Sequence, residues 1–385
     1  MHAGPEKKFY FPNLDGLRAI GASVVMIGHV SFLRSMHGEN AQEWFPVWGK
    51  VGVALFFTLS GFLITSLLLR ELEATRTIRL KDFYIRRILR IWPLYYWLVI
   101  LCIGLNFIPY YKIPLLSDQM ISSLTVLSLV NILLIIPNFT HLYIPYSDQR
   151  WSIIVEEMFY LFAPALVRWI RDRRRLVGVF CFLIVLSEVV SLLLRFVPLG
   201  AGLVFEILEQ LKYLGCIAVG CLTSVLFFER DPVLRRVLFS LAAQVVVAAA
   251  VVGCIVYTFY YTHDERSVDL RIYCFLFGVV ILNAALNPRT IFRLEHPVLK
   301  FLGKISYGIY MYHMVCIGTV YGLVRRLPVG ALAQNILLYV FSIALTIVVS
   351  WLSFTYFEAW FQRLRPRFQQ LVTRSKPAKP QVSAT

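Results

Sequence analysis

Long apolar stretches recur from one end of the chain to the other, and they constrain its fold more than any other feature. They lie at residues 14–34, 51–70, 93–109, 120–136, 152–170, 176–196, 211–228, 239–261, 271–287, 305–324 and 336–357. Each has about the 17 to 25 residues that a helix needs to cross a hydrocarbon core. Of the 385 residues, 58% are hydrophobic and 16% are charged. The sequence therefore predicts an all-α polytopic membrane protein.

The basic residues indicate which connections lie in the cytoplasm. Of the 38 Lys and Arg residues, 27 fall before residue 14, within 70–92, 168–175, 230–236 and 288–304, or in the C-terminal tail. The positive-inside rule places these connections and both termini on the cytoplasmic side of the membrane. The net charge of +16 therefore indicates contact with membrane lipids and argues against a nucleic-acid partner.

One apolar stretch cannot span, because both termini lie on the same side only after an even number of crossings. The stretch at 120–136 is short, carries Asn131 and runs into Pro137. We expect it to form a re-entrant or half-buried helix, which leaves about ten spanning helices. Residues 1–357 are then a membrane domain, and residues 358–385 are a basic cytoplasmic tail. The seven cysteines show no metal-ligand spacing, so no metal is expected.

Arg18 and His29 are polar residues inside the first apolar stretch. The two residues are eleven positions apart, and the helical rotation over eleven positions is within about 20° of three full turns. Both side chains therefore point the same way on a helix, about 16 Å apart along its axis. Ionisable residues inside a membrane are costly and indicate function. The alternatives are an Arg18 side chain that snorkels to the inner interface and a His29 ring that is simply satisfied in the core.

The stretch KDFYIRRILRIWPLYY, residues 81–96, lies in the most basic connection, 70–92, and contains Arg86, Arg87 and Arg90. It predicts an interfacial amphipathic helix that leads into a span at Pro93. Two interpretations of its arginines remain open. They anchor the chain to anionic lipid, or they bind phosphate groups of a soluble ligand on the cytoplasmic side.

Three further stretches carry polar residues. In WSIIVEEMFYLFAP, residues 151–164, Glu156 and Tyr160 are four apart and share a helix face. In FFTLSGFLIT, residues 56–65, Gly61 permits close helix approach. ISYGIYMYHM, residues 305–314, brings two tyrosines and a histidine onto one face, although tyrosines are also common at membrane interfaces.

Together these stretches resemble the acyltransferase-3 family of integral membrane acyltransferases, from about residue 9 to residue 357. NLDGLRAIGASVVMIGH matches the family's first helix with its Arg-x10-His motif, and four further blocks follow in the expected order: VGVALFFTLSGFLIT, FYIRRILRIWPLYY, WSIIVEEMFYLFAP and ISYGIYMYH. The resemblance implies about ten transmembrane helices, a cytoplasmic acyl-coenzyme A donor, and transfer to a hydroxyl group, often of a cell-surface sugar. The membrane that we expect from it is the bacterial inner membrane. The resemblance also implies that Arg18 and His29 are an essential pair and that Arg86, Arg87 and Arg90 form a basic motif. The chain departs from longer members because no SGNH-type domain is expected after the last span.

The expected reaction is therefore O-acylation, most commonly acetylation, of a carbohydrate or glycolipid at the outer half of the membrane. His29 acts as general base or as nucleophile, and the residues leave this choice open. Glu156, which we place with His29 in the outer half, is the candidate that fixes the imidazole tautomer. Arg86, Arg87 and Arg90 bind acyl-coenzyme A. Candidate substrate-binding residues are Trp151, Ser152, Tyr160, Tyr310 and His313.

Two other classes of protein stay open. A proton-coupled transporter or flippase also uses buried Arg, His and Glu residues, although this chain lacks the internal repeat of many transporters. A non-catalytic membrane subunit would not need the pairing of Arg18 with His29. Consumption of acyl-coenzyme A separates the enzyme from both.

Overall fold

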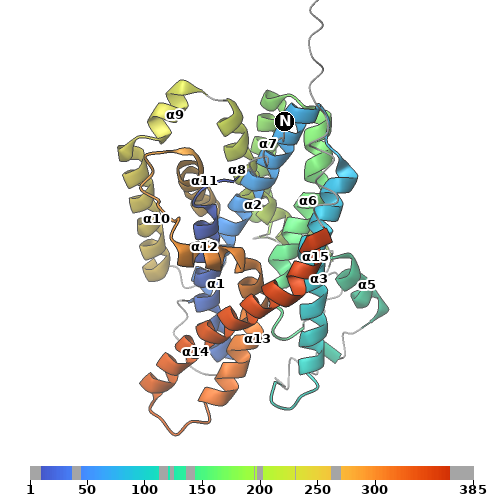
Figure 1. Ribbon diagram of the computed structural model, residues 1–385, viewed down its shortest axis with the longest axis vertical. Coiled ribbons are helices and arrows are strands. Elements are labelled where there is room, and N and C mark those ends of the chain that lie inside the picture. The colour runs from blue at the N-terminus through green and yellow to red at the C-terminus, as the bar shows by residue number, and fades with distance from the viewer. Residues whose placement is uncertain are drawn as a thin grey trace, which may run out of the picture.

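The computed structural model describes residues 10–36, 45–111, 120–121, 125–135, 144–194, 196, 203–229, 231–261 and 270–364. These residues form helices, with no strand among them (Figure 1). In chain order the elements are α1 (Leu14–Met36), α2 (Phe45–Thr75), α3 (Leu80–Leu105), α5 (Val126–Leu134), α6 (Arg150–Ile170), α7 (Arg173–Leu193), α8 (Leu203–Glu229), α9 (Pro232–Leu238), α10 (Leu241–Tyr261), α11 (Leu270–Leu286), α12 (Pro297–Lys304), α13 (Ser306–Val324), α14 (Ala331–Leu352), the π-helix η2 (Ser353–Glu358) and α15 (Ala359–Leu364).

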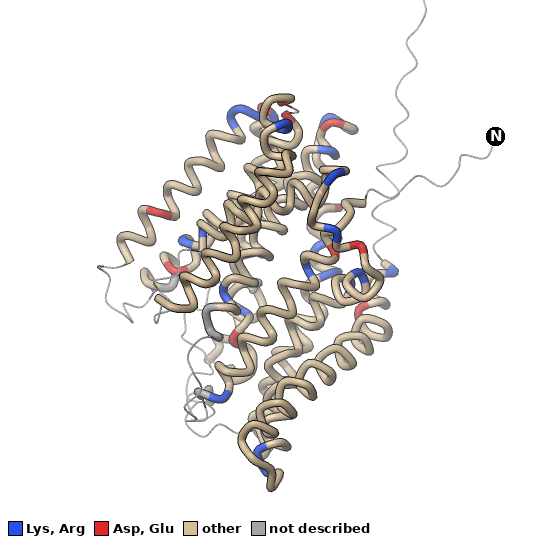
Figure 2. Tube along the Cα trace, turned by 90° about the vertical axis from the view of Figure 1, so that its left-hand side faces the viewer, with Lys and Arg blue, Asp and Glu red and all other residues tan. Residues whose placement is uncertain are grey.

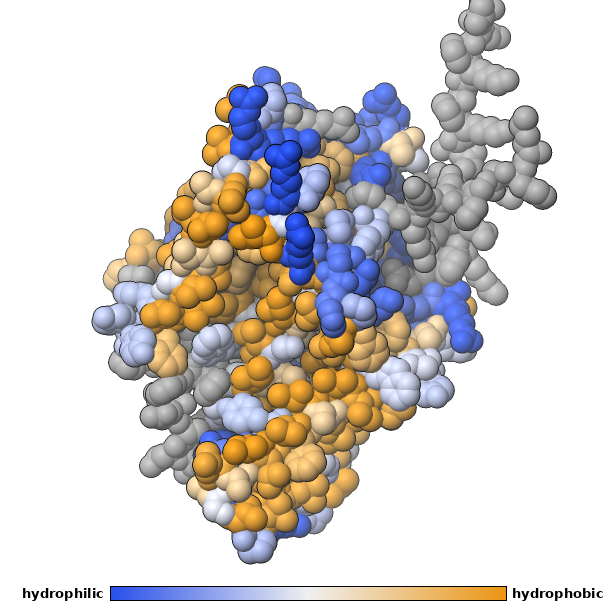
Figure 3. All heavy atoms as spheres, turned by 60° about the vertical axis from the view of Figure 1, so that its left-hand side comes forward, coloured by the Kyte–Doolittle hydropathy of each residue, from blue (hydrophilic) through white to orange (hydrophobic). Residues whose placement is uncertain are grey.

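The helices confirm the predicted all-α membrane architecture. Within the described residues, seven helices are long and apolar enough to cross a membrane: α1, α2, α3, α7, α8, α10, and α14 with its continuation. Three further helices, α6 with 21 residues, α11 with 17 and α13 with 19, coincide with stretches that the sequence also predicted to span. Lys and Arg gather toward one end of the bundle (Figure 2), and apolar side chains cover much of the surface below them (Figure 3).

Two segments bear on details of the predicted topology. Helix α5 has 9 residues, which at about 1.5 Å per residue is too short to cross a membrane, so this described part of the 120–136 stretch is not a span. The expected separate interfacial helix is not formed, because residues 81–96 belong to the continuous helix α3 with Pro93 inside it. A proline removes one backbone hydrogen bond, and here the rest of the helix maintains its course.

Helix α2 lies at the centre of the bundle and packs against α1, α6, α8 and α11. The predicted close approach at Gly61 is confirmed. A Cβ atom at Gly61 would lie 2.1 Å from the carbonyl oxygen of Ile217, and one at Gly220 would lie 2.1 Å from that of Thr58. Glycine on both sides lets the backbones of α2 and α8 touch, which is how helices associate inside membranes.

Asn13 fixes the point where α1 begins. Its φ of 63° is left-handed, a conformation that asparagine tolerates better than most residues. Its side-chain amide donates to the Ala284 carbonyl over 2.8 Å, and its side-chain oxygen accepts from the Leu294 backbone over 2.6 Å. Its backbone N–H donates to Glu295. Burial raises the pKa of Glu295, but hydrogen bonds from Lys300 and Asn13 outweigh it and lower the pKa below its ordinary value.

The packed part of the chain extends past the boundary expected at 357. Helices η2 and α15 continue from α14 as far as Leu364, and α15 lies against α3. The remainder of the predicted cytoplasmic tail, residues 365–385, lies outside the described residues, as do residues 136–143.

Candidate active site

A cavity of about 160 Å³ lies between α1, α2, α3, α6 and α13, and most of the candidate residues meet there. Helix α2 supplies much of an apolar wall that includes Phe56 and Leu63. The polar lining consists of Arg18, Ser60, Arg87, Arg90, Ser152, Glu156, Tyr160, Ser306, Tyr307 and Tyr310. Among the described residues, no group of three or more His, Cys, Asp or Glu side chains could hold a metal ion.

Glu156 is held in this cavity through both of its carboxylate oxygens. Ser60 Oγ donates to Oε1 over 2.8 Å, and Tyr160 OH donates to Oε2 over 2.9 Å. Arg87 and Arg90 lie close enough to attract the carboxylate electrostatically. The spacing of four predicted a shared face for Glu156 and Tyr160, and both line the cavity. Both carboxylate oxygens of Glu156 therefore have hydrogen-bond partners, and the contact with Ser60 ties α6 to α2.

Three arginines give the cavity a positive balance. Arg18 pairs with Asp15 at 2.9 Å, and the guanidinium of Arg87 lies 5.3 Å from the ring centre of Tyr160. Arg90 follows three residues later on α3 and also lines the cavity. In the described lining these three cations face one carboxylate, so the cavity suits an anion. Planar guanidinium groups are well matched to phosphate oxygens.

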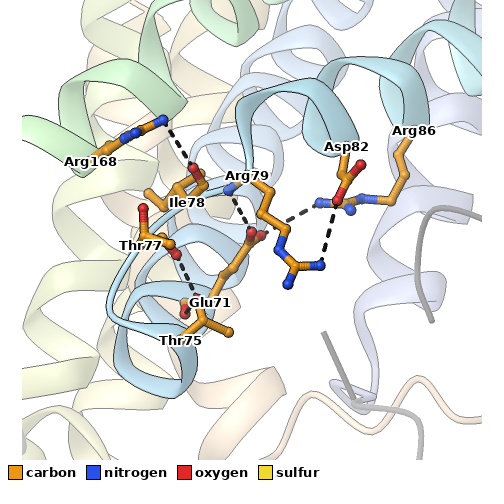
Figure 4. A network of polar contacts seen from close by, with 8 residues as sticks. All are labelled: Glu71, Thr75, Thr77, Ile78, Arg79, Asp82, Arg86 and Arg168. Carbon is orange, nitrogen blue, oxygen red and sulfur yellow. Dashed lines mark hydrogen bonds and ion pairs between the residues drawn. The ribbon is translucent and has the colours of Figure 1, made fainter. Parts of the chain in front are cut away.

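Arg86 lies apart from the two arginines with which the sequence grouped it. Its Nη2 lies 3.5 Å from Oε2 of Glu71, and its side chain is 18% exposed. The other carboxylate oxygen of Glu71 accepts from the backbone N–H of Arg79 over 2.9 Å. Figure 4 shows these contacts within one network at the turn between α2 and α3. The Arg86 side chain, from the second turn of α3, therefore joins the network at this turn, whereas Arg87 and Arg90 line the cavity.

Tyr310 of α13 joins two of the helices that line the cavity. Its hydroxyl lies 2.5 Å from Ser152 Oγ, which joins α13 to α6. The Phe56 ring packs 5.7 Å from the Tyr310 ring. Trp151 does not contribute to the described lining, because its ring packs on Tyr213 at 4.7 Å. Of the predicted substrate-binding residues on α6, Ser152 and Tyr160 therefore line the cavity.

His29 is not part of the cavity lining, and its ring packs against His313. Its Nδ1 lies 2.8 Å from the Val25 carbonyl oxygen. Because a carbonyl oxygen only accepts, Nδ1 carries the proton in the neutral ring and Nε2 holds the lone pair. The ring centres of His29 and His313 are 4.8 Å apart. The His29 ring thus has a hydrogen bond to Val25, and Glu156, which was expected to fix the tautomer, lies in the cavity lining with Arg18.

Glu358 is a buried acidic residue that the sequence analysis missed. It ends the π-helix η2, is 7% exposed, and lies within electrostatic reach of Arg90. π-helices are rare and often occur at functional sites. The signal was present in the sequence, since Glu358 is the only charged residue between Arg326 and Arg363. It was overlooked because the last apolar stretch was taken to end at residue 357.

Comparison with protein families matches residues 11–355 to the acyltransferase domain. The chain belongs to the acyltransferase-3 family. The matched region of this acyltransferase-3 chain contains every cavity-lining residue and both His29 and His313, and it ends just before Glu358. No solved structure matches the chain.

Three curated relatives illustrate the family likeness. The peptidoglycan O-acetyltransferase OatA of Listeria monocytogenes is 26% identical over 91% of this chain and 55% of its own length. The O-acetyltransferase OatA of Staphylococcus aureus is 26% identical over 91% of this chain and 57% of its own length. A protein of Staphylococcus aureus strain COL, named as a candidate O-acetyltransferase, is 27% identical over 93% of this chain. The acyltransferase-3 chain spans little more than half the length of these relatives, between 55% and 58%.

Proposed function

We propose that this chain is a membrane O-acetyltransferase that transfers an acetyl group from cytoplasmic acetyl-coenzyme A to a hydroxyl group of a cell-surface or lipid-linked carbohydrate. The observation that carries the proposal is the cavity lined by Arg18, Arg87 and Arg90 inside a membrane-spanning bundle. The names of two relatives support acetyl as the group transferred. One of these names supports peptidoglycan as the first acceptor to test.

The donor is proposed to bind with its phosphate groups on the arginines. Arg87 and Arg90 lie one turn apart on α3, directly after the basic turn that joins α2 to α3. Phe56 and Leu63 supply an apolar wall for the pantetheine arm. From Arg18, helix α1 leads toward His29, about 16 Å further along its axis. A donor that binds at the arginines therefore directs its thioester toward the histidine.

His29 is proposed to act as the general base. The acceptor hydroxyl loses its proton to Nε2, the lone-pair nitrogen in the tautomer that Val25 fixes. The hydroxyl oxygen bonds to the thioester carbon, the carbon–sulfur bond breaks, and the departing thiolate takes the proton from His29. General bases of this kind contribute about 10² to 10⁴ in rate. A covalent acyl-imidazole would use the same nitrogen.

The direct test is thiol release by purified protein in lipid nanodiscs. Acetyl-coenzyme A is supplied with peptidoglycan fragments, and the free coenzyme A thiol and acetylated product are measured. We expect release that needs both substrates, together with loss of glycan O-acetyl groups when the gene is deleted. Proton flux across vesicles without thiol release, and unchanged O-acetylation in the deletion strain, would contradict the proposal and favour a transporter.

The proposal also requires a particular orientation in the membrane. The α2–α3 turn at residues 76–79 must face the cytoplasm, and the α13–α14 turn at residues 325–330 must face outward. In a cysteine-free background, an impermeant thiol reagent should label Val329→Cys in intact cells and Thr77→Cys only after lysis. The reverse pattern would place the arginine cavity on the side without coenzyme A.

A further inference from the structure

His313 is buried beside His29, and within the described part of the chain one of its ring nitrogens has no partner. The side chain is 0% exposed, and Nδ1 lies 2.7 Å from the Tyr310 carbonyl oxygen. Nε2 is also buried and has no hydrogen-bond partner among the described residues. A buried polar atom left in this way is destabilising, so its presence in a packed core calls for a reason.

The two histidines form a matched pair. Each directs Nδ1 to a carbonyl oxygen of its own helix, His29 to Val25 and His313 to Tyr310. In the neutral rings both Nε2 atoms therefore hold lone pairs. The ring centres lie 4.8 Å apart, and the planes meet at 68°. Two neutral rings of this kind cannot form a hydrogen bond between their Nε2 atoms, because neither atom carries a proton. When one ring is protonated, the lone pair of the other can stabilise its charge.

The contacts of the His29 ring place His313 next to it. The Phe32 ring lies 5.8 Å from the His29 ring, edge to face. The backbone of α2 closes in at Gly49, where a Cβ atom would lie 3.2 Å from Cε1 of His29. Glu156, the partner expected from the sequence, is engaged in the cavity by Ser60 and Tyr160. His313 supplies a basic nitrogen at this place.

We propose that His313 stabilises the protonated form of His29 during acyl transfer, as a positioning residue that acts through His29. This inference rests on the proposed function. The acceptor O–H bond breaks as an N–H bond forms on His29, the oxygen bonds to the thioester carbon, and the thiolate leaves with the proton. While His29 carries that proton, the lone pair and electron-rich ring of His313 offset its charge. In a catalytic triad a carboxylate has the same task.

The test compares His313→Leu with His313→Gln by steady-state kinetics with acetyl-coenzyme A and by thermal unfolding. Leucine removes the acceptor atom, so we expect kcat to fall about 100-fold, with KM for acetyl-coenzyme A unchanged and Tm equal or higher. Glutamine keeps an oxygen that can accept, so we expect a loss of about tenfold. A packing role predicts the opposite order, because leucine suits an apolar site better than glutamine does.

Ser342→Ala is the matched control. The Ser342 hydroxyl on α14 is 0% exposed and has no partner among the described residues, but it lies on neither histidine helix. We expect this variant to keep its kcat. A kcat within twofold of wild type in folded His313→Leu, or a loss of kcat that follows a loss of Tm, would overturn the inference. Absence of thiol release by the wild-type protein would instead contradict the proposed function, and the inference with it.

Discussion

The two ends of α1 handle polar groups inside a membrane in opposite ways. At the Arg18 end, fixed charges are numerous and leave a positive balance: Arg18 pairs with Asp15 and Glu156 accepts two hydrogen bonds, while Arg87 and Arg90 also line the cavity. At the His29 end two imidazole rings pack together, and a ring nitrogen of His313 has no partner within the described chain. A positive balance of fixed charges suits an anionic ligand, whereas a nitrogen with a free lone pair can respond to a proton.

This difference indicates a division of labour along one helix. The cavity is proposed to bind the donor and the histidine pair to move the proton, with about 16 Å of helix between them. Substitutions at the Arg18 end should then change affinity, and those at the His29 end should change turnover. The four predictions below test whether the two ends separate in this way.

The largest effect is expected from His29→Ala. Loss of the general base should lower kcat by about 10² to 10⁴, and the dissociation constant of coenzyme A should stay within twofold of wild type. The two quantities are measured by thiol release and by calorimetric titration in detergent. Equal losses of turnover and of affinity would show that the two ends of α1 are not separate.

His296→Asn is the control for removing an imidazole elsewhere. His296 caps α12 by accepting from the Val298 backbone N–H over 3.3 Å, and asparagine is also a good N-cap. We expect wild-type turnover from this variant. Wild-type turnover from His29→Ala itself would exclude His29 from the chemistry.

The next largest effect is expected from Arg90→Gln. A hydrogen bond to a charged group is worth about 1.5 to 3 kcal/mol, so coenzyme A should bind about tenfold or more weakly. Arg90→Lys should recover part of the affinity, because it keeps the charge and loses the planar fork. Calorimetric titration of both variants measures the difference. Unchanged affinity in Arg90→Gln would move the donor site out of the cavity.

The fold followed from the sequence wherever one segment decided the outcome by itself. Apolar length predicted the spans, and the small residue at Gly61 predicted a close helix contact. Pro93 was misleading because its position suggested a boundary, whereas α3 runs through it. A proline costs one backbone hydrogen bond, and the packing of the surrounding helix decides whether that cost breaks it.

The site was harder to predict because its contacts join helices far apart in the chain. The spacing along α6 put Glu156 and Tyr160 on one face, but the period of a helix carries no information about which helix lies opposite. The contacts of Glu156 with Ser60 and of His29 with His313 depend on that choice. They therefore became visible only in the packed structure.

Glu156→Gln is expected to have a moderate effect on the affinity for coenzyme A, and to raise it where most substitutions would lower it. It removes the carboxylate that faces three arginines in the cavity lining, so coenzyme A should bind more tightly. Unit charges about 4 Å apart in water interact by about 1 kcal/mol, which corresponds to about fivefold in the dissociation constant. Glu157→Gln is the control, since Glu157 bonds Trp92 outside the lining. A loss of kcat in Glu156→Gln as large as that of His29→Ala would restore Glu156 as the partner of His29.

The smallest effect, and the sharpest test of where the cavity ends, is expected from Arg86→Gln. This change breaks the 3.5 Å contact with Glu71 at the α2–α3 turn. Ion pairs near a surface contribute up to about 1 kcal/mol, so Tm should fall slightly while the affinity for coenzyme A stays at the wild-type value. Arg86→Lys should recover most of the stability, because a lysine can also pair with Glu71. A tenfold loss of affinity in Arg86→Gln would instead extend the donor site from the cavity to the turn, and the Arg18 end of α1 would then bind its ligand through all three arginines of the 81–96 segment.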